Sequence, residues 1–398
     1  MTEQPKRICI LGGGFGGLYT ALRLSQLPWE KSPAPQITLV DRNDRFLFSP
    51  LLYELLTGEL ETWEIAPPFA ELLADTNIKF HQACVTGIDV EAKRVQLEND
   101  SPLSYDRLVI ALGGKTPLDI VPGAKEYALP FRSLNDAYNL AQRLRILENS
   151  QPDKIRVAIV GGGYSGVELA CKIADRLGQK GRIRIIERED KILTSSPEFN
   201  RQAAHKALQA KKVWIDLETS VQSVAEDSIS LLYKGKTDTI PVDIVLWTVG
   251  NQVGDLIKSL PLKSNQQGLL LTNPQLQVQG YEDIYALGDV AECSDATGQK
   301  VPATAQAAFQ QSDFCAWNLW ASLSERPLLS FRYQNLGEMM ALGKDNATLS
   351  GLGMKLDGNL AYVARRLIYL YRLPTNKHQL EVGWNWLAGP IIRELGMV

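Results

Sequence analysis

Two glycine-rich stretches of the same kind lie far apart in this chain. The first is Gly12-Gly13-Gly14-Phe15-Gly16-Gly17 and the second is Gly161-Gly162-Gly163-Tyr164-Ser165-Gly166. The spacing G-x-G-x-x-G permits a tight turn and lets the backbone approach the phosphates of a dinucleotide. Because one such loop serves one dinucleotide, two loops predict that the chain holds two of them. A flavin and a nicotinamide form the natural pair, with a hydride passing between them.

An acidic residue follows each glycine stretch, at the end of the next expected strand. These residues are Asp41 and Glu187, and both come later than the roughly 20 residues that are usual for this motif. A carboxylate there binds ribose hydroxyls, and Glu187 would repel a 2′-phosphate, which favours NADH. Arg184 and Arg188 favour the 2′-phosphate of NADPH instead, so the choice of nicotinamide stays open.

The elements that must position these residues are predicted on both sides of each loop. The expected strands are 7–11, 36–40, 155–160 and 182–186, and the expected helices are 18–27 and 167–177. Short apolar runs are typical of buried parallel strands. The order of strand, glycine loop, helix and strand is the context that the motif requires. We therefore predict an α/β fold with two doubly wound, Rossmann-like dinucleotide-binding domains and a small C-terminal module.

Three more apolar segments run into glycine: 105–114, 244–250 and 283–291. A glycine at a strand end lets the backbone approach a bound nucleotide. In the third segment, Asp289 follows Gly288 and can hold the ribityl hydroxyls of a flavin. The N-terminus of the helix that follows can face the pyrophosphate.

Composition excludes several classes of protein. The chain has 398 residues, 45% of them apolar and 22% charged, which is ordinary for a globular protein of two or three domains. A net charge of −3 gives no reason to expect nucleic acid as a partner. The five cysteines form no CxxC pair, so we expect neither a disulfide framework nor a metal site. We expect no signal peptide, because the short polar start leads directly into a strand, and no spanning helix.

At these motifs the chain resembles the two-dinucleotide flavoproteins, and among them the type II NAD(P)H:quinone oxidoreductases. The resemblance is carried by residues 41–59, 161–170, 302–311 and 331–347. The run 51–69 resembles the cyanobacterial and chloroplast branch, which is associated with demethylnaphthoquinone reduction in phylloquinone synthesis and with plastoquinone-type acceptors. The redox cysteine pair of disulfide reductases and sulfide:quinone oxidoreductases is missing from the sequence.

This resemblance implies FAD as the bound cofactor and NADH or NADPH as the co-substrate. Gly12, Gly14, Gly17, Asp41 and Asp289 would hold FAD, and Gly161, Gly163, Gly166 and Glu187 would hold the nicotinamide dinucleotide. The full expected set of cofactor-binding residues also includes Phe15, Gly16, Arg42, Val85, Gly113, Tyr164, Ser165, Gly250 and Gly288.

Three residues are expected to act on the substrates. Gln306 and Gln310 match the family's AQxxxQ pattern near the flavin ring and the quinone, where an amide can donate a hydrogen bond to a quinone carbonyl. The alternative is that both line the helix that begins near Thr304. Glu168 matches an acidic position near the nicotinamide and the quinone. Its alternative is a carboxylate that the helix dipole stabilises in the first turn.

The composition of the chain changes in its C-terminal segment. Apolar residues recur at helical spacing from Leu360 to Tyr371, and Trp384 and Trp386 follow. Residues 360–398 contain five Lys or Arg and two Glu, and a basic amphipathic segment with tryptophans suits a membrane interface. A dimer interface or a cap on the flavin domain is the alternative. Family members outside this branch often have lysine where Arg365 or Arg366 falls, so a basic group there is expected to face the flavin or the quinone.

Taken together, these features predict four segments. They are an FAD domain in two parts (1–118 and 269–340), an NAD(P)H domain (119–268) and a C-terminal module for membrane association or dimerisation (341–398). The predicted activity passes a hydride from NAD(P)H to the flavin and two electrons to a lipid-soluble quinone, without proton pumping. We expect a peripheral homodimer on the cytoplasmic side of a membrane, which in a cyanobacterium would be the thylakoid or plasma membrane. The alternatives are a soluble ferredoxin-type reductase and a redox sensor that binds NAD(P)H without turnover.

Overall fold

A computed structural model describes residues 4–29 and 33–394, with side chains described as far as Ala388. The chain forms two compact units, each assembled from segments that are distant in sequence. Unit 1 comprises Met1–Phe46, Ala66–Lys115 and Asn251–Gln334, and unit 2 comprises Leu47–Ile65, Thr116–Gly250 and Asn335–Val398. These units are defined by packing. The division at residues 118, 268 and 340 is a division by function and stays a prediction.

Unit 1 is built on a parallel five-stranded sheet in the order β19-β7-β1-β2-β3. Its strands are β1 (Arg7–Leu11), β2 (Gln36–Asp41), β3 (Ile78–Gln82), β7 (Arg107–Ile110) and β19 (Ile284–Ala286). Four of the five residues of β1 are buried, as a parallel strand with both faces covered requires. The strand that leads into the first glycine stretch therefore lies at the centre of the sheet.

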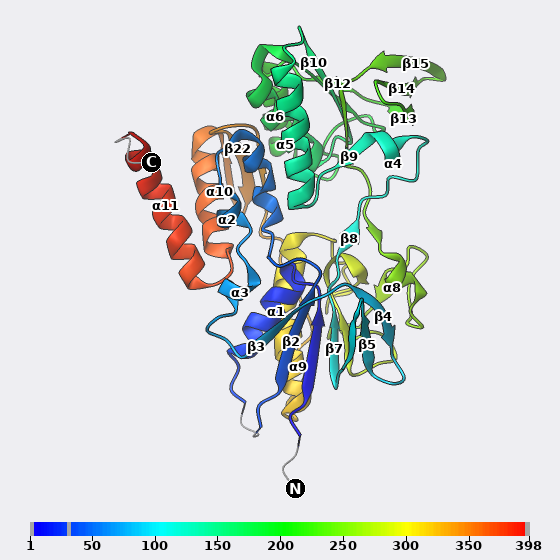
Figure 1. Ribbon diagram of the computed structural model, residues 1–398, viewed down its shortest axis with the longest axis vertical. Helices are drawn as coiled ribbons and strands as arrows, with labels where there is room; N and C mark the ends of the chain where they lie inside the picture. The colour runs from blue at the N-terminus through cyan, green and yellow to red at the C-terminus, as the bar shows by residue number, and fades with distance from the viewer. Residues whose placement is uncertain (1–3, 30–32, 395–398) are drawn as a thin grey trace. The chain divides into compact units, whose positions relative to one another are not determined.

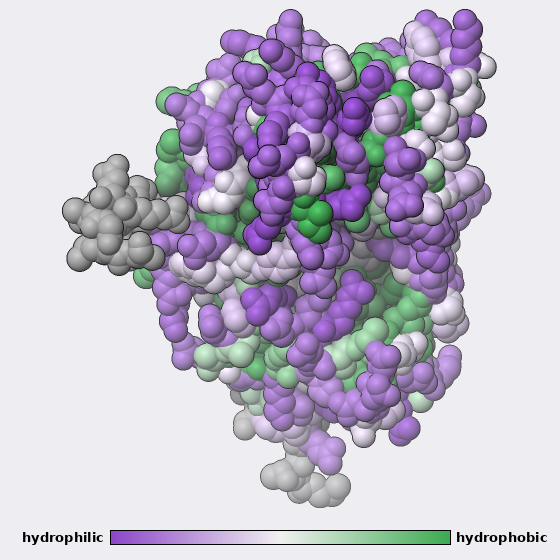
Figure 2. Space-filling view, turned by 45° about the horizontal axis from the view of Figure 1, so that its top comes forward, coloured by the Kyte–Doolittle hydropathy of each residue, from purple (hydrophilic) through white to green (hydrophobic). Residues whose placement is uncertain are grey.

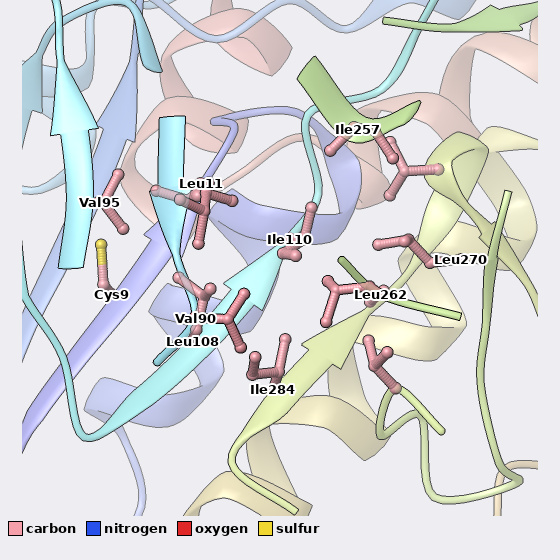
Figure 3. Packing of buried hydrophobic residues seen from close by; sticks show 14 of the residues in the cluster. Cys9, Leu11, Val90, Val95, Leu108, Ile110, Ile257, Leu262, Leu270 and Ile284 are labelled. Carbon is pink, nitrogen blue, oxygen red and sulfur yellow. The ribbon is translucent and has the colours of Figure 1, made fainter. Parts of the chain in front are cut away.

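Helices and a second, small sheet complete unit 1. Helix α1 (Phe15–Ser25) packs against α9 (Ala305–Leu323), as Figure 1 shows. Strands β4 (Val85–Asp89), β5 (Arg94–Leu97) and β6 (Asp100–Ser104) form an antiparallel sheet. Figure 3 shows Cys9 and Leu11 of β1 in one core with Val90 and Val95. Shorter elements are α3 (Phe69–Leu72), β8 (Gly114–Lys115), β17 (Gln252–Val253), α8 (Asp255–Ser259), β18 (Leu270–Leu271), η3 (Gly288–Val290) and β20 (Ala291–Glu292).

Unit 2 repeats this topology in its own parallel sheet, β12-β11-β10-β16-β9. Its strands are β9 (Ala128–Pro130), β10 (Ile155–Val160), β11 (Gly181–Ile186), β12 (Trp214–Asp216) and β16 (Ile244–Trp247). The helices are α4 (Ala124–Tyr127), α5 (Leu134–Asn149), α6 (Tyr164–Leu177), η2 (Gly178–Lys180) and α7 (Glu198–Ala210). A three-stranded antiparallel sheet again follows, formed by β13 (Thr219–Val224), β14 (Ser228–Tyr233) and β15 (Lys236–Pro241). The strand that leads into the second glycine stretch is again central.

The remaining segments of unit 2 are η1 (Ser49–Thr57), α2 (Thr62–Ile65), β21 (Glu338–Ala341), β22 (Ala347–Gly351), β23 (Met354–Asp357), α10 (Gly358–Arg372) and α11 (Asn376–Glu394). Asn200 on α7 bonds Thr348 and Ser350 of β22, each at 2.9 Å, which fixes this sheet to the dinucleotide-binding part. Helix α10 stops before Pro374, whose ring cannot continue a helix. Among the helices of the described residues, none is both long and apolar enough to cross a membrane.

The elements expected around the two glycine loops and the helix expected near Thr304 are present. Strands 7–11 and 155–160 match β1 and β10, whereas both helices begin three residues early, at Phe15 and Tyr164, because the glycine loop is already helical there. Asp289 lies in the single turn η3, and the short strand β20 comes before the helix that follows. The next helix, α9, begins at Ala305, where the Thr304 side chain accepts a hydrogen bond from the N–H of Ala307.

Candidate functional site

The first glycine loop is folded tightly on one side and open on the other. A Cβ on Gly17 would lie 1.8 Å from the carbonyl oxygen of Gly12, so only glycine allows α1 to begin this close to the loop. A Cβ on Gly14 would have no heavy atom within 4 Å. The Asp41 carboxylate accepts a hydrogen bond from the N–H of Gly13 at 2.6 Å and another from the N–H of Asn43 at 2.8 Å. Open space beside a helix N-terminus fits a pyrophosphate.

The second loop repeats this geometry in unit 2. A Cβ on Gly166 would lie 1.9 Å from the carbonyl oxygen of Gly161, and a Cβ on Gly163 would again meet nothing within 4 Å. The Glu187 carboxylate accepts hydrogen bonds from the N–H groups of Gly162 at 2.6 Å and Glu189 at 2.9 Å. Both loops are thus built for the same class of ligand, and each carboxylate is fixed beside its loop.

The other residues expected at FAD also lie in unit 1. The ring of Phe15 packs edge-on against that of Phe46, with centroids 5.5 Å apart. Arg42 is exposed directly after Asp41, and Val85 begins β4. Gly16 is buried in α1, while Gly113 and Gly288 have φ of +70° and +71°, which favours glycine at both positions. Asp289 lies within η3.

Gln306 and Gln310 lie on α9, on the helix that was the alternative to a substrate contact. The hydroxyl of Tyr333 donates to Gln306 Oε1 at 3.1 Å. Gln310 pairs with the backbone of Gln334 through both ends of its amide, at 2.8 and 3.0 Å. The next residue, Gln311, was missed, although it accepts a hydrogen bond from the N–H of Gly288 at 2.9 Å. The available sequence signal was a second glutamine directly after the AQxxxQ pattern.

Near the second loop, the two candidate arginines differ in their surroundings. Arg184 forms an ion pair with Asp216 at 2.9 Å, and its guanidinium lies 5.5 Å from the ring centroid of Trp214. The side chain of Arg188 is 81% exposed directly after Glu187 and pairs with Glu189 at 3.2 Å. Arg188 is therefore the arginine that is accessible at the end of β11.

Two side chains of the second loop and one glycine complete the expected set. The hydroxyl of Tyr164 donates to Ser196 Oγ at 3.0 Å and also bonds Glu338, and burial raises the pKa of this phenol. Ser165 Oγ accepts a hydrogen bond from the Tyr53 hydroxyl at 3.0 Å. Gly250 has φ of +85° at the end of the segment that follows β16. The loop is thus joined to η1 and to the C-terminal sheet within unit 2.

Glu168 belongs to a group of five charged residues inside unit 2, which we call the buried charge cluster. Its members are Glu54 and Glu59 near η1, Glu168 and Lys172 on α6, and Arg365 on α10. Arg365 is bonded to Glu54 at 2.5 Å and lies 3.4 Å from Glu168. Lys172 is bonded to Glu59 at 2.5 Å and lies 3.9 Å from Glu54. Of the two arginines at which a basic group was expected, Arg365 is the one that lies next to Glu168.

The carboxyl groups of this cluster differ in proton affinity. Burial raises the pKa of Glu168 to about 7, against the opposing effects of Arg365 and of the N–H of Ala341, which donates to Glu168 at 2.8 Å. Burial acts in the same direction on Glu54, but Arg365 and Lys172 outweigh it and hold the pKa of Glu54 below its usual value. Glu168 can therefore hold or release a proton near neutral pH.

Sequence reasoning missed Glu54, Glu59 and Lys172 as parts of this site. Two signals were available. Glu54 interrupts the apolar run LLYELL, and Lys172 follows Glu168 by four positions, which places both on one face of a helix. What the sequence did not contain was the pairing of Arg365 with Glu54, 311 positions earlier, and with Glu168, 197 positions earlier.

Comparison with known proteins now identifies the family. Residues 6–312 match the model of the pyridine nucleotide-disulphide oxidoreductase family. The chain belongs to this family. It is 60% identical to demethylphylloquinone reductase NdbB of a Synechocystis species, over 98% of each chain. It is 43% identical to the alternative NAD(P)H-ubiquinone oxidoreductase C1 of Arabidopsis thaliana, over 100% of this chain and 83% of that one.

A solved structure confirms the fold of this family member. NDH2 of Plasmodium falciparum, in complex with NADH, superposes with a TM-score of 0.86 at 20% identity, over 97% of this chain and 98% of that one. The predicted α/β fold with two dinucleotide-binding domains is confirmed. With the two relatives above, the chain belongs to the type II NAD(P)H:quinone oxidoreductases, as its motifs indicated.

Proposed function

We propose that the protein is an FAD-dependent NAD(P)H:quinone oxidoreductase that reduces a membrane quinone without pumping protons. The observation that carries this proposal is the pair of equivalent loops, each with a carboxylate bonded to its middle glycine, in a chain of the type II family. The names of its relatives support a quinone as the acceptor. The 60% identity to a demethylphylloquinone reductase favours a naphthoquinone such as demethylphylloquinone, with plastoquinone as the second candidate.

Residues of the two loops would bind the two cofactors. FAD, when bound, supplies the chemistry of accepting a hydride and returning two electrons. The open space beside Gly14 and the N-terminus of α1 suit its pyrophosphate, while Asp41 suits its ribose. In unit 2, the space beside Gly163 and the carboxylate of Glu187 suit NADH or NADPH in the same way.

Protons must reach the quinone together with the electrons. A quinone takes up two electrons and two protons when it becomes a quinol. The hydride of NAD(P)H supplies both electrons and one proton, so one further proton must come from solvent through the protein. Glu168 is buried and has a pKa of about 7, which suits a group that gives up one of these protons near neutral pH. The amides of Gln306 and Gln310 suit hydrogen bonds to the quinone carbonyls.

The C-terminal helices support membrane association. On the face that Figure 2 shows, polar residues cover most of the surface and hydrophobic residues form separate patches. On α10 and α11, by contrast, large apolar side chains are exposed at helical spacing: Leu360, Val363, Leu367, Tyr371, Leu380, Trp384 and Leu387. Such a stripe with basic residues nearby suits the cytoplasmic surface of a membrane, where a lipid-soluble quinone is available. A second copy of the chain, giving a homodimer, is the other occupant to test.

Steady-state turnover tests the proposed activity. The purified protein should be yellow and should oxidise NADH or NADPH continuously when a quinone is present, with a panel of naphthoquinones, plastoquinone and ubiquinone analogues ranking the acceptors. Reduction of the flavin by one equivalent of nucleotide without turnover would favour a redox sensor. Turnover with ferredoxin but with no quinone of the panel would favour a soluble ferredoxin-type reductase.

A further inference from the structure

The buried charge cluster contains three carboxyl groups but only two cations. The side chains of Glu54, Lys172 and Arg365 are 0% exposed, that of Glu168 is 9% exposed and that of Glu59 is 11% exposed. An uncompensated charge in such an environment costs several kcal/mol, and buried carboxyl groups respond by taking up a proton. The cluster is neutral when one of its three carboxyl groups is protonated.

Geometry decides which carboxyl group holds that proton. Glu54 lies 2.5 Å from Arg365 and 3.9 Å from Lys172, so it faces both cations. Glu59 is paired with Lys172 at 2.5 Å and also accepts a hydrogen bond from the Tyr362 hydroxyl at 3.1 Å. Glu168 has only the longer contact with Arg365, at 3.4 Å. Glu168 is thus the carboxyl group whose nearest cation contact is the longest of the three.

The groups around Glu168 come from four elements of unit 2. The backbone N–H of Ala341 in β21 donates a hydrogen bond to Glu168. Arg366 lies at the rim, where it bonds the Glu59 carbonyl oxygen at 3.3 Å and stacks on Trp386. The titratable or charged side chains that interact with Glu168 are Tyr53 and Glu54 of η1, Tyr164, Cys171 and Lys172 of α6, and Arg365 and Tyr369 of α10. Only Arg365 and Lys172 among these side chains carry positive charge.

We propose that Glu54 is a positioning residue, whose carboxylate holds Arg365 and so leaves Glu168 as the protonated member of the buried charge cluster. This inference rests on the proposed function, in which Glu168 gives that proton to the quinone and is reloaded from solvent. Glu54 and Glu168 compete for one guanidinium. Without the negative charge of Glu54, Arg365 would pair fully with Glu168, and the cluster would be neutral with every remaining carboxyl group ionised.

Infrared spectroscopy tests the protonation directly, without reference to activity. In the full-length flavoprotein at neutral pH, a protonated carboxyl group gives a C=O band that shifts in heavy water. We expect one such band that is missing from both Glu168→Gln and Glu54→Gln, although Glu54→Gln keeps Glu168 in place. The double variant Glu54→Gln/Arg365→Gln should regain the band, because it again has one carboxyl group more than it has cations.

Half-reaction kinetics test the consequence for the quinone. Glu54→Gln should reduce its flavin with NAD(P)H at the wild-type rate. Its quinone half-reaction should be slower by about tenfold for each unit by which the pKa of Glu168 falls, with the decline in rate displaced to lower pH. The control is Glu61→Gln, which changes an exposed carboxyl group near η1 and should leave both half-reactions unchanged.

Three outcomes would overturn the proposal. The first is the absence of any infrared band that depends on Glu168. The second is a band that persists in Glu54→Gln. The third is a quinone half-reaction with the same pH dependence in Glu54→Gln as in the wild type. If Glu54→Gln does not fold, Lys172→Gln tests the same balance between carboxyl groups and cations. It removes a cation instead of a carboxyl group, so it should add a second protonated carboxyl group. A wild-type protein that reduces no quinone would refute the proposed function, while the infrared result would still decide the role of Glu54.

Discussion

Glycines of one loop serve different purposes, and substitutions can separate them. Alanine at Gly17 places a methyl group 1.8 Å from the Gly12 carbonyl oxygen, so the loop or α1 must move. Such overpacking costs about 1–3 kcal/mol or more, and we expect Gly17→Ala to lower the thermal unfolding temperature of the FAD-free protein. Alanine at Gly14 meets no protein atom within 4 Å. Gly14→Ala should therefore unfold like the wild type but bind FAD more weakly.

The two measurements are calorimetry of the apoprotein and titration with FAD. The pair is internally controlled, because both changes add the same methyl group to the same loop. Equal unfolding temperatures for the two apoprotein variants would contradict the packing argument. Unchanged FAD affinity in Gly14→Ala would mean that the open side of the loop does not receive the pyrophosphate.

Glu168 should also make the stability of the protein depend on pH. Its pKa is raised from 4.5 to about 7 in the folded chain, so the folded state binds this proton more tightly than the unfolded state does. The free energy of unfolding therefore falls as the pH rises from about 4.5 to 7, by at most about 3 kcal/mol. Glu168→Gln cannot titrate. Its unfolding temperature minus that of the wild type should increase between pH 5 and pH 8, and a constant difference would contradict the raised pKa.

At the scale of elements, helices α10 and α11 carry the stripe of exposed apolar side chains that would contact a membrane. Each has one buried side and one exposed apolar side: Arg365 and Tyr369 of α10 and Val382 of α11 are buried, whereas Leu367 is 59% and Trp384 71% exposed. Burying one large apolar side chain in lipid contributes about 1.5–3 kcal/mol. We expect Leu367→Gln/Trp384→Gln to weaken binding to liposomes with anionic lipids by at least tenfold, as measured by co-sedimentation.

The control for this experiment must remove exposed apolar surface elsewhere. Ile146 and Tyr138 on α5 are 53% and 49% exposed, so Ile146→Gln/Tyr138→Gln is matched in size and should bind liposomes like the wild type. Removal of the whole tail from Gly358 onward would be less informative, because it also removes the buried Arg365. If the α10 and α11 variant binds liposomes normally but becomes monomeric, the stripe is a dimer interface.

Sequence patterns predicted elements best where a residue's own neighbours determine its structure. Apolar runs and glycine spacing located β1, α1, β10 and α6 to within a few residues. They did not indicate the short strand β20 after Asp289, which pairs with β18. They also gave no sign that η1, α6 and α10 enclose one group of charges, because helical periodicity indicates which side of a helix is buried and not what it is buried against.

At the scale of the whole molecule, the two units carry nearly identical loops. Asp41 and Glu187 bond the middle glycine at the same distance, 2.6 Å, so local geometry does not distinguish the flavin loop from the nicotinamide loop. The assignment comes from their surroundings. Unit 1 also contains Asp289 and the AQxxxQ helix α9, whereas unit 2 has Arg188 exposed next to its acid. An experiment can therefore separate the two loops by changing one acid at a time.

We expect the isosteric changes Asp41→Asn and Glu187→Gln to have different effects. FAD remains bound through the catalytic cycle, and Asp41→Asn weakens one of its contacts. The purified variant should therefore contain less FAD. Once it is saturated with FAD, its KM for NADH should be unchanged. Glu187→Gln removes a charge that repels a 2′-phosphate. Its kcat/KM for NADPH relative to NADH should rise by about tenfold, equivalent to about 1.4 kcal/mol, with FAD content unchanged. Exchanged effects would mean that the loops hold the opposite dinucleotides. An unchanged nucleotide preference would mean that Glu187 does not contact the ribose and that Arg188 does not act on the 2′-phosphate.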